Sequence, residues 1–280
     1  MLADFDFRIR QPTGRLGDAI ESVWFAQGTV PYEREAISPT GSTVVVLVLG
    51  DPIGYTAGGG PELVTGEGFV AGPHDRPAIN APRGQTHAIG IVTRPTGCAP
   101  VVGRPPSLLR GRVADVTEVW PLGSVLRTHV LGLDPEVALD AIVERLEHSV
   151  SPHDRRRARC ARWVARLELE PTLPIASLAN VAGLTPAHLT HEFTVHVGLT
   201  PRVLARLLRM RAVLAAIDIE PDAPWTEIAH RHGWFDQAHF IRDFKRHTGV
   251  TPTVYVDRQR RSFAPGQAAS DTGVGFVPEI

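Results

Sequence analysis

The sequence has very little cysteine and no long apolar run. Its two cysteines, Cys98 and Cys160, form no CxxC motif, which excludes a disulfide framework and a cysteine-rich zinc site. No apolar stretch approaches the length of about eighteen residues that a membrane-spanning helix needs. The N-terminus lacks the basic segment and apolar run of a signal peptide. We therefore expect a cytoplasmic protein with no membrane partner.

The motifs of common enzyme classes are also absent. There is no GxSxG, P-loop or HExxH, and no GxGxxG follows a strand; the three glycines at 58–60 lack the lysine or helix start of a phosphate cradle. Eight of the twelve histidines fall in 151–262, but no pair has a third ligand at metal spacing. We expect no catalysis, metal or cofactor. A metal at His74 and His87, or a redox role for Cys98, is a weaker alternative than a structural role.

The 280 residues are enough for two domains with separate cores, and the charge is divided unevenly between them. The segment 151–262 has 17 basic against 11 acidic residues, whereas the rest of the chain has 12 against 19. This asymmetry indicates that one part of the chain meets a polyanion. The alternative is that the arginines only solvate helices.

A pattern of two short helices occurs twice, about fifty residues apart, between Ile175 and Pro252. The recurring residues are Ile175, Leu178, Ala179, Gly183, Leu189, Phe193, Gly198, Thr200 and Pro201 in the first copy, and Trp225, Ile228, Ala229, Gly233, Phe240, Phe244, Gly249, Thr251 and Pro252 in the second. This register predicts a duplicated structural unit.

Each copy predicts two helices that meet at a glycine. Gly183 supplies the positive φ of the turn, and Thr185 or, in the second copy, Asp236 caps the second helix. The apolar i, i+4 pairs, Leu189 with Phe193 and Phe240 with Phe244, are expected to pack the second helix against the first and to leave its opposite face free. We predict one helix-turn-helix at 175–198, another at 225–249, and a rigid spacer helix at 203–217 between them.

The flanking segments complete the predicted organisation. An amphipathic, arginine-rich helix is predicted at 154–167, within a basic domain at 151–258. Another helix is predicted at about 135–148, at the end of an N-terminal domain that covers 1–150. The glycine- and serine-rich tail at 259–280 is predicted to be disordered.

The first 130 residues predict a β-rich barrel or sandwich. The run TVVVLVL at 43–49 has the composition of a strand buried on both faces. Further strands are predicted at 66–71, 78–80 and 87–93, and a short helix at 14–25. The fold class is therefore α+β, with this β-rich domain preceding an all-helical one.

The two repeated stretches carry a family resemblance. IASLANVAGLTPAHLTHEFTVHVGLTP and WTEIAHRHGWFDQAHFIRDFKRHTGVTP resemble the DNA-binding domain of AraC/XylS transcription regulators over about 155–256. The resemblance implies a seven-helix domain with two recognition helices in successive major grooves. It implies promoter DNA and RNA polymerase as partners, with activation as the expected regulation. The first 130 residues resemble an uncharacterised sensing-type domain, which would bind a small effector, form a homodimer, or do both.

The resemblance also implies which residues face DNA. In the first recognition helix they are Ala187, Thr190 and His191, with His188 and Thr194 at the margins. In the second they are Gln237, Ala238, Ile241 and Arg242, with Lys245 and Arg246 nearer the phosphates. Gln237 can pair with adenine and Arg242 with guanine. His239 is assigned to a structural or phosphate-contacting role.

Two questions remain open at the level of sequence. Glu192 places a negative charge near a groove unless it faces an arginine, so the first unit either reads bases through Thr190 and His191 or only orients the domain. The N-terminal domain could instead be a fused small-molecule enzyme or a dimerisation module without a ligand. A convergent cluster of titratable groups in its interior would favour the enzyme.

Overall fold

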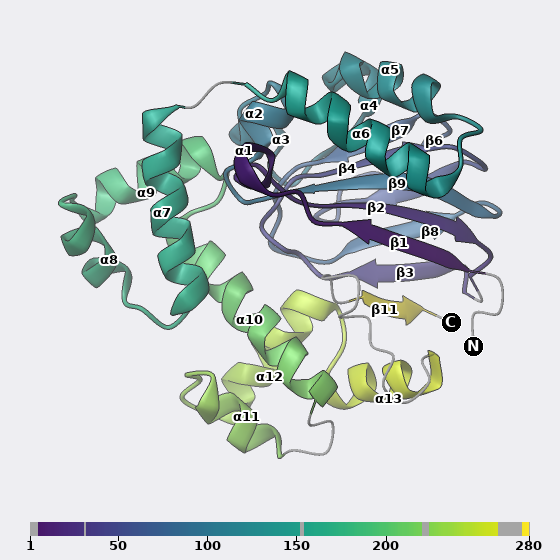
Figure 1. Ribbon diagram of the computed structural model, residues 1–280. Coiled ribbons are helices and arrows are strands. Elements are labelled where there is room, and N and C mark those ends of the chain that lie inside the picture. Colours follow the sequence, from purple (N-terminus) through teal and green to yellow (C-terminus); the bar gives the residue numbers. More distant parts are fainter. Residues whose placement is uncertain (1–4, 31, 152–153, 220–223, 263–275, 280) are drawn as a thin grey trace.

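The computed structural model describes residues 5–30, 32–151, 154–219, 224–262 and 276–279 (Figure 1). The strands are β1 (Asp6–Arg10), β2 (Ile20–Gly28), β3 (Arg34–Ile37), β4 (Val44–Val48), β5 (Ile53–Thr56), β6 (Leu63–Thr65), β7 (Gly68–Ala71), β8 (Ala78–Pro82), β9 (Thr86–Thr93), β10 (Val113–Asp115) and β11 (Phe276–Glu279). The helices are α1 (Gly14–Gly17), α2 (Cys98–Val102), α3 (Pro106–Leu109), α4 (Val116–Val119), α5 (Pro121–Val130), α6 (Pro135–Ser149), α7 (Arg155–Leu169), α8 (Ile175–Ala182), α9 (Pro186–His196), α10 (Pro201–Ile219), α11 (Trp225–Arg231), α12 (Gln237–Thr248) and α13 (Pro252–Ser262).

The N-terminal half contains two antiparallel sheets. One has the strand order β1-β2-β9-β4-β7-β10 and the other β11-β3-β8-β5-β6. They share a core in which Val46 and Phe69 of the first sheet meet Ile53 and Tyr55 of the second, and the rings of Tyr55 and Phe69 stack with centroids 4.2 Å apart. The predicted barrel or sandwich is thus a sandwich of two sheets rather than a closed barrel.

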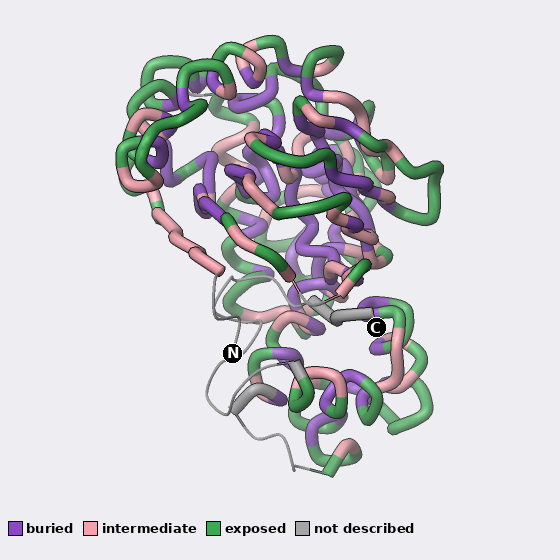
Figure 2. Tube along the Cα trace, turned by 90° about the vertical axis from the view of Figure 1, so that its right-hand side faces the viewer, coloured by how far each residue is buried: buried purple, intermediate pink, exposed green. Residues whose placement is uncertain are grey.

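The prediction that the 43–49 strand is buried on both faces is confirmed by β4. Val45 and Leu47 pack into a core with the helices that cover the outer face of the six-stranded sheet, whereas Val46 and Val48 face the other sheet. Figure 2 shows many buried segments (purple) inside this half of the chain, with exposed segments (green) around them. A strand between two apolar layers has no solvent face, which explains its unbroken aliphatic run.

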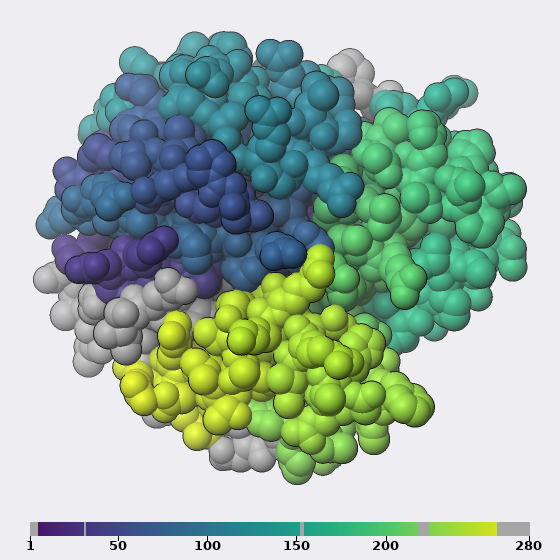
Figure 3. All heavy atoms as spheres, turned by 180° about the vertical axis from the view of Figure 1, so that it is seen from behind, coloured from purple at the N-terminus to yellow at the C-terminus, as the bar shows by residue number. Residues whose placement is uncertain are grey.

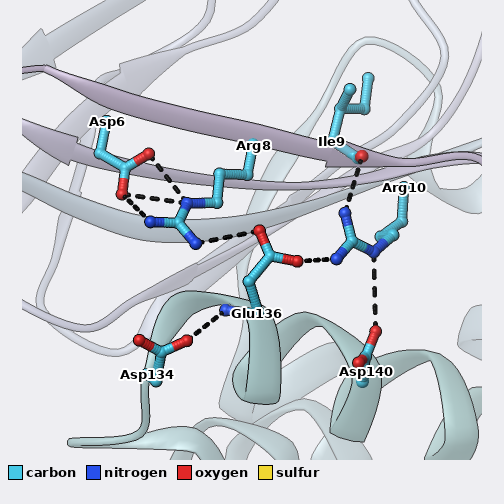
Figure 4. A network of polar contacts seen from close by, with 7 residues as sticks. All are labelled: Asp6, Arg8, Ile9, Arg10, Asp134, Glu136 and Asp140. Atoms are coloured by element: carbon cyan, nitrogen blue, oxygen red, sulfur yellow. Dashed lines mark hydrogen bonds and ion pairs between the residues drawn. The ribbon is translucent and has the colours of Figure 1, made fainter.

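Charged residues fasten the edge strand β1 to α6 (Figure 4). Arg8 bonds Glu136 at 2.9 Å and Asp6 at 2.8 Å. Arg10 pairs with the same Glu136 and lies 3.6 Å from Asp140. The strand β1 is therefore held by α6, which lies where a helix was predicted at about 135–148.

Two sequence predictions about the N-terminal half are wrong. The helix expected at 14–25 is a single turn at Gly14–Gly17, and Ile20–Gly28 is the strand β2, because it pairs with both β1 and β9. The prediction of a β-rich domain over the first 130 residues, with one short helix at 14–25, also left out the ten-residue α5. The predicted strands at 43–49, 66–71, 78–80 and 87–93 correspond to β4, β7, β8 and β9.

The second half contains seven helices, α7–α13, between residues 154 and 262 of its described part. It has two cores. Leu204 and Leu207 at the start of α10 belong to the core of α7, α8 and α9; Met210, Val213 and Leu214 further along α10 belong to the core of α11, α12 and α13. The helix α10 covers the predicted spacer, and its two ends are built into different helix-turn-helix units.

The predicted disordered tail needs correction. Residues 259–262 continue α13, and 276–279 form β11, which pairs antiparallel with β3. The hydrogen bonds of a sheet edge, rather than side-chain composition, order this second piece. The remaining tail positions, 263–275 and 280, lie outside the described residues.

The two halves pack directly against each other. Asp75, in the loop after β7, pairs with Arg206 and Arg246, and Glu21 of β2 pairs with Arg211. Ala36 of β3 is part of the same core as α12 and α13. Figure 3 shows the first helical unit (green) and the second (yellow-green to yellow) both lying against the N-terminal domain.

Candidate nucleic-acid interface

The turn of each helix-turn-helix unit forms as the sequence predicts. Gly183 follows α8 with a φ of 67°, and Gly233 lies in the second turn with a φ of 80°. Both values are in the left-handed region, which glycine adopts without a steric penalty. The second helix of each unit can therefore cross the first within a few residues.

Each recognition helix begins at a side-chain cap. The hydroxyl of Thr185 accepts a hydrogen bond from the backbone N–H of His188 at 3.2 Å, and the carboxylate of Asp236 accepts one from His239 at 2.7 Å. These bonds satisfy N–H groups that the helix itself leaves unpaired. The predicted starts of α9 and α12 are confirmed.

The buried face of each recognition helix is also as predicted. Leu189 and Phe193 of α9 are fully buried, as are Phe240 and Phe244 of α12. Phe244 packs edge-on against both Phe240 and Tyr255 of α13. With these side chains directed inward, the opposite face of each helix is turned outward.

Most of the predicted DNA-facing residues lie on that outward face. The exposed ones are Ala187, His188, His191, Gln237, Ala238, His239, Arg242, Lys245 and Arg246, and the half-buried ones are Thr190, Thr194 and Ile241. Ile241 packs against the core of the second unit, so only part of its side chain is available.

The polar side chains of α12 differ in how far they are engaged. The amide oxygen of Gln237 accepts a 3.0 Å hydrogen bond from Thr226, which leaves its NH₂ group free to donate. Arg246 is paired with Asp75. Among the described residues, no ion pair or side-chain hydrogen bond involves Arg242 or Lys245. These two cations are therefore available to an outside partner.

The two threonines of α9 are restricted in what they can read. The Thr190 hydroxyl donates to the carbonyl of Pro186 at 2.8 Å, and the Thr194 hydroxyl donates to that of Thr190 at 2.9 Å. Since each hydroxyl has one proton, both can only accept a further hydrogen bond. Toward DNA this limits them to amino groups of bases, such as those of cytosine or adenine.

The structure answers the question about Glu192. Its side chain is buried, and it accepts a hydrogen bond from Arg159 of α7 at 3.2 Å. His188 and His196 lie 3.7 and 4.0 Å from the same carboxylate. Glu192 therefore faces an arginine inside the domain, and its charge is not directed at a groove.

Asp243 of α12 holds the matching place in the second unit. It accepts a 3.0 Å hydrogen bond from the indole N–H of Trp234, and Arg209 lies 3.8 Å away. His239 lies 3.4 Å from the same carboxylate, which agrees with a structural or phosphate-contacting role for this histidine. The roles of Arg209 and Trp234 were not predicted from the sequence.

Two other groups of the N-terminal half bear on the alternatives. The Glu35 carboxylate accepts hydrogen bonds from Asn80 at 2.7 Å and Tyr32 at 2.9 Å, and burial raises its pKa. These residues form a titratable cluster. Both oxygens of the Glu35 carboxylate already accept a hydrogen bond within it, which is typical of a structural network. Burial also raises the pKa of the Cys98 thiol to about 11, which works against thiolate chemistry there.

Two observations concern ligands and membranes. Within the described ranges, no three His, Cys, Asp or Glu side chains gather as metal ligands would. In the same part of the chain, no helix combines the length and hydrophobicity needed to cross a bilayer.

Comparison with known families matches each half of the chain separately. The model of a helix-turn-helix domain matches residues 178–258. A domain of unknown function, DUF6597, matches residues 8–115. Among curated proteins, none matches significantly. The resemblance deduced from the repeated stretches is thus confirmed for the second half.

Several solved structures are similar to parts or most of the chain. The C-terminal domain of AraT, a response regulator from Geobacillus stearothermophilus, is 22% identical, with 41% of this chain and 96% of that one covered and a TM-score of 0.35. ToxT from Vibrio cholerae is 9% identical, with coverages of 91% and 98% and a TM-score of 0.47. A DNA-binding transcriptional dual regulator from Escherichia coli K-12 is 22% identical, with coverages of 39% and 96% and a TM-score of 0.32.

Proposed function

We propose that the chain is a DNA-binding regulator of the AraC type, built on the helix-turn-helix domain at residues 178–258, and that α9 and α12 enter successive major grooves of one promoter site. The observation that carries this proposal is the duplicated unit. Each copy buries one face of its second helix and leaves the other face exposed, and α10 joins the cores of both. A shared helix keeps two reading surfaces in a fixed relation, as binding to adjacent turns of DNA requires.

The second unit contributes most of the sequence preference. Arg242 is exposed and unengaged among the described residues, and Gln237 retains a free NH₂ group, so both can donate to base edges. The first unit offers threonines that can only accept and the exposed ring of His191. It therefore orients the domain and reads bases lightly, while Lys245 and the exposed arginines Arg155 and Arg156 meet phosphates.

The N-terminal domain controls binding through its contacts with the second half. A small effector would have to bind more tightly to one arrangement of the two halves than to the other. Among the described residues, the ion pairs across this boundary come from Glu21 and Asp75, whereas α6 is tied to β1. The route from effector to DNA thus runs through the loop after β7 rather than through α6. A homodimer and contact with RNA polymerase complete the proposed function.

Selection from a random duplex library with the full chain tests the proposal. We expect two enriched blocks whose centres are about 10 base pairs apart. Arg242→Ala should then weaken binding to the selected duplex by about 1–3 kcal/mol and leave a scrambled duplex almost unaffected. The absence of any enriched sequence would refute the proposed function. Equal weakening on both duplexes would reassign Arg242 to the phosphates.

A further inference from the structure

The internal duplication extends further upstream than the two helix-turn-helix units. The offset of fifty residues also relates α7 to α10. The matched buried pairs are Cys160 with Met210, Val164 with Leu214, and Leu167 with Ile217. Each repeated unit is therefore three helices, in which a long helix packs against the helix-turn-helix that follows it.

The same offset relates two arginines that reach across this packing. Arg159 of α7 corresponds to Arg209 of α10, and Glu192 of α9 corresponds, at an offset of 51, to Asp243 of α12. In both units the arginine approaches the acid, at 3.2 Å in the first and 3.8 Å in the second. A pairing between a long helix and a recognition helix thus appears twice in one chain.

The second unit holds its arginine by three contacts. The Arg209 guanidinium lies 3.9 Å from the centroid of a Trp234 ring and donates to the carbonyl of Gly233 at 3.3 Å. Trp234 in turn donates its indole N–H to Asp243. Arg209 consequently contacts the turn before α12 and the middle of α12 at once. A planar guanidinium can stack on a ring and bond in its own plane, which an ammonium cannot do.

In the first unit the contact is simpler. Arg159 lies 5.2 Å from the ring of Trp163, which is on α7 itself, and bonds Glu192. Among the described residues, the partners of Arg159 are Trp163 and Glu192, and neither lies in the turn between α8 and α9. The recognition helix that carries Gln237 and Arg242 is therefore held at more points than the one that carries Thr190 and His191.

The acidic residues Glu192 of α9 and Asp243 of α12 lie where their ion pairs control the rotation of each recognition helix about its own axis. The side chain of Asp243 is only 15% exposed and that of Glu192 only 7%, so an unpaired charge at either position would be costly. Asp243 directly follows Arg242 in sequence, and successive residues of a helix are set about 100° apart. Holding Asp243 against Arg209 thus fixes the direction in which Arg242 points.

We propose that Arg209 and its counterpart Arg159 are positioning residues that set the rotation of α12 and α9 and thereby the discrimination between DNA sequences. They need not contact DNA themselves. This inference rests on the proposed function, because it concerns how the same two helices read bases. It assigns the larger effect to Arg209, which has the additional contacts with Gly233 and Trp234.

The test compares Arg209→Met with Arg202→Met in the full chain. Both remove one arginine from α10, but Arg202 is exposed in its first turn. The measured quantity is the ratio of affinities for the duplex selected by the wild type and its scrambled version. A side chain that makes two well-placed hydrogen bonds to one base contributes about 1–3 kcal/mol of discrimination. We therefore expect Arg209→Met to lower this ratio about tenfold. Arg202→Met should leave the ratio unchanged.

Two further variants separate positioning from loss of folding. Arg209→Lys keeps the charge but not the planar group, so it should also lower the ratio while thermal unfolding shows a folded protein. Asp243→Asn combined with Arg209→Met should lower the ratio no further than Arg209→Met alone. Unchanged ratios in Arg209→Lys and Arg209→Met would overturn the inference. Failure of the wild type to select any duplex would instead refute the proposed function.

Discussion

The carboxylate of Asp75 accepts a 2.7 Å hydrogen bond from Arg246, which joins the N-terminal domain to the last turns of α12. Arg206 of α10 bonds the same carboxylate oxygen at 2.9 Å. Burial alone would raise the pKa of Asp75, but the hydrogen bond from Arg246 and the positive charges of Arg246, Arg206 and Arg76 hold it below its ordinary value. Asp75 therefore binds Arg246, an arginine that the family resemblance places near the DNA phosphates.

Asp75→Asn should tighten binding to DNA of any sequence. The substitution releases Arg246, and one additional phosphate contact should steepen the plot of log affinity against log salt by about 0.9. Titration of selected and scrambled duplexes at several salt concentrations measures both effects. Glu21→Gln is the control, since it breaks the 3.0 Å pair with Arg211 without touching a recognition helix. Weaker binding by Asp75→Asn would show instead that Asp75 holds α12 ready for DNA.

Lys245→Ala should weaken binding uniformly. Lys245 is exposed and has no side-chain partner among the described residues, so its expected partner is a phosphate. The salt dependence should become shallower by about 0.9, with no change in sequence preference. A loss confined to the selected duplex would contradict this and would make Lys245 a base-reading residue.

Asp236→Ala should destabilise the start of α12. The lost cap bond to the N–H of His239 should cost about 1 kcal/mol, and the helix end that carries Gln237 should fray. Chemical denaturation measures the first effect and binding to the selected duplex the second. Thr185→Ala is the matched change in α9, where the cap bond is longer. A loss of stability without any loss of binding would separate helix fraying from DNA recognition.

Acid should destabilise the protein through His247. Burial is the main cause that lowers its pKa to about 3, and Arg206, Arg211 and His74 add repulsion. A depressed pKa means that the unfolded chain takes up a proton first, so stability is lost as the pH falls below about 6.5. Between about pH 7 and pH 5 the loss from this residue should be about 2 kcal/mol.

His247→Gln should remove most of that dependence. Urea unfolding of the wild type and the variant at both pH values gives the difference directly. His129→Gln serves as the control because His129 is exposed on α5. An equal pH dependence in the wild type and His247→Gln would show that this histidine is protonated in the folded protein.

Local patterns predicted the helical half well. Periodic apolar residues, a glycine turn and a cap are all encoded within a few residues, so α8, α9, α11 and α12 could be placed from the sequence. In the N-terminal half the spacing of Ile20, Val23 and Trp24 fits a helix as well as a strand. Pairing with β1 and β9 decides in favour of the strand, and such long-range contacts leave no local signal.

The site was predictable only in part for the same reason. The exposed faces of α9 and α12 follow from periodicity, but the partner of Glu192 lies 33 residues away and that of Arg246 lies 171 residues away. The equivalence of Arg159 and Arg209 was present in the sequence. It becomes evident once the fifty-residue offset is applied upstream of Ile175.

The pairing of β11 with β3 makes the sandwich depend on residues that follow the DNA-binding domain in the chain. The strand order in the second sheet is β11-β3-β8-β5-β6. A fragment that stops near residue 150 would lack β11, so the backbone of β3 would become an open sheet edge. Open edges recruit strands from other molecules. Self-association of such a fragment would therefore report a missing strand, and a fair measure of the native assembly state needs the intact chain.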